Sequence, residues 1–154
     1  MLAIDPGASG AIVYDSPDGV QVVNMPDGID DLLEAIRDAR FAGSDTTQSL
    51  YCFVEKVGTY MPGNSGPAAA TFARHCGRVE MAVHACGLAQ IQITPAVWMK
   101  SLGALPSDKS ARKKRIKELM AMRFPDIKVT LKNADALGIY CYGKEYLAAR
   151  KEAV

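Results

Sequence analysis

Short apolar segments alternate with turns over the first 25 residues of the chain. Segments 2–4 and 11–14 flank a turn that contains Pro6-Gly7 and Ser9-Gly10, and segment 20–25 follows a second turn at 15–19. Apolar segments joined by turns of this composition form β-hairpins. The pattern therefore predicts three antiparallel strands in succession.

The remainder of the chain alternates between helical and strand-like patterns. Apolar residues recur at helical spacing in four segments, and a short helix begins after a Thr-Pro pair. A continuous apolar run is typical of a buried strand, and an alternating run is typical of a strand at or near a sheet edge. The predicted helices are 29–40, 68–86, 96–100, 111–123 and 134–149, and the two further strands are 50–54 and 89–93. This order predicts an α/β fold.

Two of the predicted strands end in a carboxylate. Asp5 follows the first strand and Glu55 follows the fourth, and a third acid, Asp135, lies in the first turn of the last helix. Burying a carboxylate at a strand end is costly unless it binds a cation or hydrogen-bond donors. Each of two acids also has a structural explanation. An aspartate before Pro-Gly favours a turn, which would account for Asp5, and a carboxylate in a first helical turn interacts favourably with the helix dipole, which would account for Asp135. The repetition at two strand ends favours a cation site.

Composition restricts the class of protein. The chain has 154 residues, of which 49% are hydrophobic and 23% charged, so we expect one folded domain spanning 1–154. No segment resembles a signal peptide or a membrane span, which predicts a cytoplasmic protein without membrane contact. The four cysteines show no CxxC spacing, so we expect reduced core residues.

Positive charge is concentrated in one part of the chain. Residues 100–132 carry ten basic and three acidic side chains, whereas residues 1–99 carry five basic and eleven acidic ones. Such a block suits a contact with a polyanion, and it also suits a solvated helix face. Tyr60 and Met61 lie in a glycine-rich loop just after Glu55, where they either stack on a nucleic-acid base or fold back onto the core.

Several segments together resemble the Holliday junction resolvases of the RuvC family, which have an RNase H-like fold, and most closely its phage-type branch. The resemblance covers nearly the whole chain, and its pieces are specific in this order and spacing. They are Ile4-Asp5-Pro-Gly7, Val54-Glu55-Lys56-Val57 with Met61-Pro-Gly63, Thr94-Pro95 with Trp98 and Lys100, the helix from Lys109 to Phe124-Pro125, and Ala134-Asp135-Ala-Leu137.

The resemblance implies a five-stranded mixed sheet, with three antiparallel strands and then parallel ones, flanked by helices. It also implies a homodimer that cleaves four-way (branched) DNA junctions with Mg²⁺, for which Mn²⁺ substitutes, with two ions per site and no small-molecule cofactor. Asp5, Glu55 and Asp135 would bind metal, and Lys100 would add positive charge at the phosphate. The residues expected to contact DNA are Lys56, Tyr60, Met61, Lys109, Arg112, Lys113, Arg115 and Lys132.

One position departs from the family pattern. Family members usually carry another acid or a histidine a few residues before the final aspartate, where this chain has Leu131, Lys132 and Asn133. A non-catalytic protein that binds branched DNA is therefore an alternative. An ATPase of the actin and sugar-kinase type is a weaker one, because that fold needs a second lobe with a second phosphate loop.

Overall fold

The computed structural model describes residues 1–43, 51–58 and 65–151. Every predicted strand and helix is present, with ends that differ by one or two residues. The strands are β1 (Leu2–Asp5), β2 (Ala11–Ser16), β3 (Gly19–Asn24), β4 (Tyr51–Glu55) and β5 (Ala89–Ile93). The helices are α1 (Ile29–Ala42), α2 (Gly66–Ala85), α3 (Pro95–Ser101), α4 (Lys109–Arg123) and α5 (Ala134–Lys151). No helix in the described ranges is long and apolar enough to cross a membrane.

The five strands form one mixed sheet in the order β3-β2-β1-β4-β5. The pairs β1–β2 and β2–β3 are antiparallel, and the pairs β1–β4 and β4–β5 are parallel. This topology confirms the predicted mixed sheet and the edge position of β5. Strand β1 lies in the centre, so its segment Leu2-Ala3-Ile4 is completely buried, as its continuous apolar sequence indicates.

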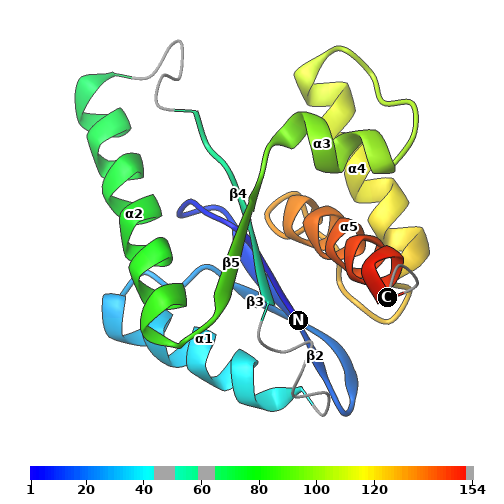
Figure 1. Ribbon diagram of the computed structural model, residues 1–154. Helices are drawn as coiled ribbons and strands as arrows, with labels where there is room; N and C mark the ends of the chain where they lie inside the picture. Colours follow the sequence, from blue (N-terminus) through cyan, green and yellow to red (C-terminus); the bar gives the residue numbers. More distant parts are fainter. Residues whose placement is uncertain (44–50, 59–64, 152–154) are drawn as a thin grey trace.

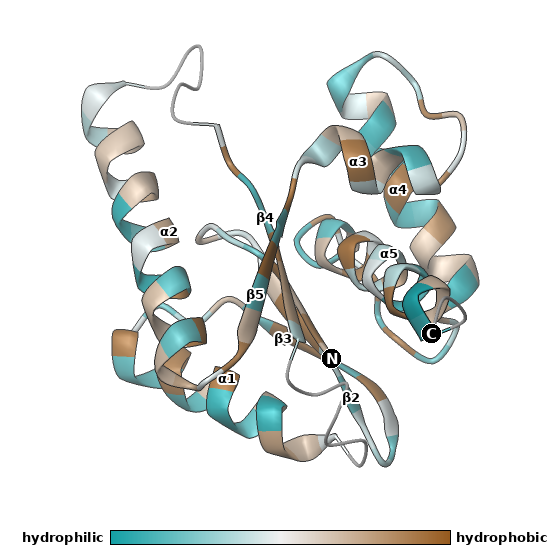
Figure 2. Cartoon of the chain, viewed as in Figure 1, coloured by the Kyte–Doolittle hydropathy of each residue, from teal (hydrophilic) through white to brown (hydrophobic). Residues whose placement is uncertain are grey.

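Helices cover both faces of the sheet, α1 and α2 on one side and α3, α4 and α5 on the other (Figure 1). Successive strand residues point to opposite faces. Ala3 and Phe53 therefore belong to the core beneath α3, α4 and α5, whereas Leu2, Ile4 and Cys52 belong to the core beneath α1 and α2. The apolar strands lie between helices whose outer faces are more polar (Figure 2).

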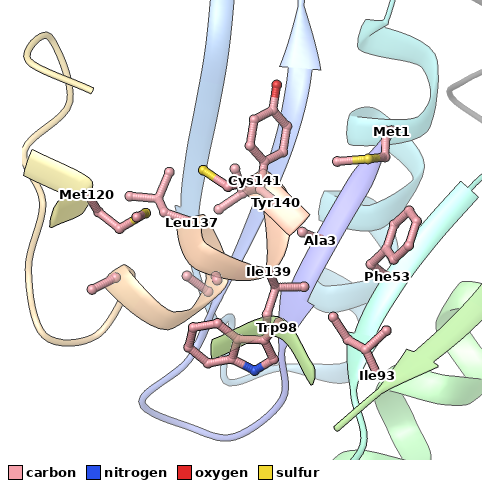
Figure 3. Close-up of a cluster of buried hydrophobic side chains, with 14 of the residues drawn as sticks. Met1, Ala3, Phe53, Ile93, Trp98, Met120, Leu137, Ile139, Tyr140 and Cys141 are labelled. Atoms are coloured by element: carbon pink, nitrogen blue, oxygen red, sulfur yellow. The ribbon is translucent and has the colours of Figure 1, made fainter. Parts of the chain in front are cut away.

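Helix α5 is the most buried helix of the second layer. It contacts β1, β2 and β4, and half of its residues are buried. Its side chains Leu137, Ile139 and Tyr140 pack with Trp98 of α3 and Met120 of α4 in a single cluster (Figure 3). The first turn of α5, which carries Asp135, is therefore held firmly against the sheet.

A buried asparagine fixes the turn before α5. Asn133 stands directly before the helix, where an asparagine side chain commonly caps the first turn, but here the side chain turns back toward the preceding loop. Its Oδ1 accepts a hydrogen bond from the backbone N–H of Thr130 (2.7 Å), and its Nδ2 donates to the carbonyl oxygen of Lys128 (3.2 Å). Asn133 thus fixes the loop that delivers the chain into α5.

Candidate functional site

The parallel pairing of β1 and β4 brings two of the predicted acids together. Ile4 lies opposite Val54 in the register, so the next residues of the two strands are Asp5 and Glu55. Helix α5 packs on β1 and places Asp135, in its first turn, at the same end of the sheet. Three carboxylates from three separate segments thus share one edge.

The turn after β1 closes tightly around Asp5. The backbone N–H of Gly10 donates to the carbonyl oxygen of Gly7 (2.9 Å), and a Cβ atom at Gly10 would lie 1.9 Å from the carbonyl oxygen of Asp5. Any larger residue at position 10 would therefore displace the backbone of Asp5. The glycine in this turn is required by that close approach.

The three carboxylates line a cavity of about 460 Å³. The turn 6–10 forms one wall, and Phe72 of α2, with Pro95 and Met99 of α3, contributes apolar surface. Lys109, Arg112 and Lys113 of α4 line the same cavity. The arrangement therefore combines an acidic floor with a basic wall, which suits a cation and a polyanion bound side by side.

Burial and mutual repulsion perturb all three acids. Burial, followed by the charges of Glu55 and Asp135, raises the pKa of Asp5 to about 8. Burial also raises the pKa of Glu55 against a hydrogen bond from Trp98, and it raises the pKa of Asp135 against the charge of Lys113. Three acids with raised pKa values in one cavity are typical of a functional site.

Each carboxylate has a different set of partners. The indole N–H of Trp98 donates to Oε1 of Glu55 (2.9 Å), and Nζ of Lys113 lies 3.6 Å from Oδ2 of Asp135. No donor among the described residues forms a hydrogen bond with the Asp5 side chain. A half-buried carboxylate without a hydrogen-bond donor is costly in a folded protein, and a bound cation would reduce that cost.

The donor set fits a hard divalent cation. Mg²⁺ prefers carboxylate oxygens and retains water, and three carboxylates around an open cavity supply both. As the side chains stand, no group of three acids, histidines or cysteines within 1–43, 51–58 and 65–151 is arranged to hold one ion. Trp98 and Lys113 hold Glu55 and Asp135 in their present positions. The Lys113 side chain is half exposed, so solvent weakens its ion pair with Asp135.

The remaining predicted site residues occupy several places. Lys100 is exposed on α3 and is not one of the residues that line the cavity. Lys56 and Lys132 are exposed near the ends of β4 and α5, and Arg115 pairs with Glu118 on the surface of α4 (3.6 Å). Tyr60 and Met61 lie outside the described residues, so their predicted role in DNA binding is not addressed by the structure.

Two features of the site escape sequence reasoning. The pairing of Trp98 with Glu55 joins residues 43 positions apart. Phe72 covers Gly7 from α2, where a Cβ at Gly7 would lie 3.2 Å from its ring. The sequence gives only weak signals for these two contacts: Trp98 is a lone tryptophan between two predicted site residues, and Phe72 is one of the apolar residues at helical spacing in 68–86. A larger cavity of about 710 Å³, between β3 and residues 123–133, contains none of the three site acids.

Comparisons with known proteins support the fold. No protein-family model and no curated protein matches the sequence. Among solved structures, Thermus thermophilus RuvC in complex with a Holliday junction substrate is 16% identical, with a TM-score of 0.53 over 90% of this chain and 87% of that one. A second Thermus thermophilus RuvC structure is 17% identical, with a TM-score of 0.48 over 90% and 89% of the two chains. The chain therefore has a RuvC-like fold of the RNase H type.

Proposed function

We propose that this chain is a metal-dependent endonuclease that cleaves four-way DNA junctions. The observation that carries the proposal is the cavity in which Asp5, Glu55 and Asp135 meet beside the basic residues of α4. The fold similarity to a RuvC bound to a Holliday junction supports the same substrate class. Mg²⁺, or Mn²⁺ in its place, would be held by the three acids, two ions per site, and would supply an activated water and stabilise the leaving oxygen.

The side chains of the protein divide the remaining tasks. Lys109 and Lys113 present amines at the cavity wall, where they attract the phosphate backbone of DNA. The guanidinium of Arg112 donates to the carbonyl oxygen of Ser107 (2.8 Å), which fixes the loop leading into α4 and keeps a positive charge beside the acids. The apolar wall formed by Phe72 and Met99 excludes water from one side of the reacting phosphate.

Resolution of a junction requires cuts in two opposed strands, so we propose that the active form is a homodimer with two such cavities. Lys100 would add positive charge at the reacting phosphate. Lys56, Arg115 and Lys132 would extend the basic surface toward the DNA arms, and Tyr60 and Met61 would enter the unstacked centre of the junction. Membership of the phage-type branch stays a prediction from the segments Met61-Pro-Gly63 and Trp98-Met-Lys100.

The decisive experiment incubates a synthetic four-way junction with the protein and Mg²⁺ and measures strand cleavage. The variants Asp5→Asn, Glu55→Gln and Asp135→Asn should lose cleavage and keep junction binding in chelator, because basic side chains and not these acids contact the phosphates. The control is Asp126→Asn, which alters an exposed acid outside the cavity. Wild-type protein that binds junctions and never cleaves them would instead identify a non-catalytic junction-binding protein, the alternative that the residues before Asp135 leave open.

A further inference from the structure

Trp98 occupies an unusual position beside the three acids. It lies in α3, which begins immediately after β5, and its side chain is completely buried. The indole nitrogen carries the donor of the hydrogen bond to Oε1 of Glu55 (2.9 Å). Figure 3 shows the ring lying beside Ile139 of α5, with its nitrogen on the edge away from Met120. The ring therefore connects the end of β4 to the second helical layer.

The other edge of the same ring packs against the backbone of α5. A Cβ atom at Gly138 would lie 2.6 Å from Cζ3 of Trp98, closer than real Cβ contacts come, and 3.1 Å from Cε3. Gly138 follows Asp135 by three residues, so the two lie on one side of α5, one turn apart. The indole thus lies between Oε1 of Glu55 and the backbone of α5 at Gly138, one turn after Asp135.

The indole N–H of Trp98 is a suitable hydrogen-bond donor for a carboxylate that binds a cation. An indole N–H is neutral and donates only one hydrogen bond, so it orients Oε1 without cancelling the charge of Glu55. Oε2 receives no hydrogen bond from the described residues. A lysine in the same place would form an ion pair with the carboxylate, as Lys113 does with Asp135, and would therefore compete with a cation. Residues that hydrogen-bond to a metal ligand and orient it, without binding the metal themselves, strongly influence metal affinity.

We propose that Trp98 is a positioning residue that fixes the orientation of Glu55 through its N–H and the distance from Glu55 to Asp135 through its ring. This inference rests on the function proposed above, because it concerns the same three acids. It adds a residue whose role is separable into two parts: the hydrogen bond, which can be deleted without changing the shape of the ring, and the spacing, which cannot.

The first test compares two replacements of Trp98. 3-Benzothienylalanine exchanges the N–H for sulfur in a ring of nearly the same shape, so only the hydrogen bond is lost. Trp98→Phe removes the N–H together with part of the ring. Binding of Mn²⁺ alone, measured by calorimetry, should weaken about 10- to 100-fold in both proteins. The melting temperature of the benzothienyl protein should remain near that of the wild type. Val97→Ala, which alters an exposed neighbour on α3, is the control.

The outcomes distinguish this inference from the proposed function. Unchanged Mn²⁺ affinity in the benzothienyl protein, with Glu55→Gln inactive in junction cleavage, would overturn the role of Trp98 and leave the nuclease function standing. Wild-type protein that binds no Mn²⁺ would overturn both. Weaker Mn²⁺ binding in the benzothienyl protein, with normal metal-free junction binding, would support the inference, because a merely structural tryptophan would not affect metal affinity alone.

A second test uses the unmodified protein. Trp98 is the single tryptophan of the chain, so one indole N–H signal in a ¹H–¹⁵N correlation spectrum reports on this bond without assignment. Adding Mg²⁺ should shift that signal in the wild type, and Glu55→Gln should shift it without metal and abolish its response to Mg²⁺. An indole signal that ignores both Mg²⁺ and Glu55→Gln would show that the bond to Glu55 does not form in solution.

Discussion

Replacing Gly138 with alanine should destabilise the protein, although the same change usually stabilises a helix. Within a helix, Ala is favoured over Gly by about 1 kcal/mol. At position 138, however, the new methyl group would lie 2.6 Å from Cζ3 of Trp98, more than an ångström inside normal carbon–carbon contact. The indole cannot move away easily, because it is completely buried and is hydrogen-bonded to Glu55.

The magnitude follows from the two opposing effects. Overpacking a filled core costs about 1–3 kcal/mol, and a clash with a ring held at both edges belongs in the upper half of that range. After the helix-propensity gain of about 1 kcal/mol is subtracted, Gly138→Ala should lower the free energy of unfolding by about 1–2 kcal/mol. For a chain of this length the melting temperature should fall by about 2–8 °C.

Gly77→Ala provides the matched control. Gly77 lies within α2, and a Cβ atom there would meet no atom of residues 1–43, 51–58 and 65–151 within 4 Å, so helix propensity is the effect that remains. That variant should gain about 0.5–1 kcal/mol. Both free energies of unfolding are measured by urea denaturation at one protein concentration. If Gly138→Ala is as stable as Gly77→Ala, the ring does not press on α5, and the argument that it sets the spacing of the site fails.

Three further predictions concern charge. Asp5→Asn should raise the melting temperature measured in chelator, because it removes a mostly buried carboxylate that two neighbouring acids repel. It should also abolish the further rise that we expect Mg²⁺ to give the wild type; an unchanged response to Mg²⁺ in a thermal scan would exclude Asp5 as a ligand. The double variant Lys109→Glu, Lys113→Glu should bind all DNA forms more weakly, and its slope of log affinity against log salt should be less steep by about 0.9 per lost phosphate contact. A slope equal to that of the wild type in a fluorescence titration would show that this face of α4 is only solvated. Burial opposes ionisation of Asp15, but hydrogen bonds from Tyr140 and from the amino group of Met1 hold its pKa below the ordinary value. The stability that the Asp15 carboxylate contributes is therefore present at neutral pH and is lost as the pH falls through that lowered pKa. Asp15→Asn should accordingly be less stable than wild type in urea at pH 7, with a difference that narrows in acid; a difference independent of pH would contradict this account.

The sheet and two of its acids could be predicted from the sequence because their causes are local. A central strand covered on both faces is a continuous apolar run, and a carboxylate that ends such a run is conspicuous. Asp5 and Glu55 follow from this pattern alone. Asp135 could be placed in a first helical turn, but the resemblance was needed to connect it with the other two.

Side-chain partners could not be predicted, because they depend on how distant segments pack. Lys100 is exposed on α3 and does not line the cavity. Trp98, two positions earlier, points into the protein toward Glu55, and residues two positions apart on a helix face in different directions. The role of Lys100 at the phosphate stays a prediction. The nearby positive charge comes from α4, whose Lys113 meets Asp135 across 22 residues of sequence.

The packing of α5 against β1 has a consequence for the order in which the protein is assembled. Asp5 belongs to the first strand and Asp135 to the last helix, so the cavity joins the two extremes of the described chain. Contacts between such distant segments form late and slow the folding of a domain. During synthesis, a chain that has not yet reached Ala134 exposes the sheet face that carries Ala3 and Phe53 and has no third acid. The cavity with its three acids is therefore complete only when α5 docks, and chains that stop short of Ala134 lack the third of the proposed metal ligands.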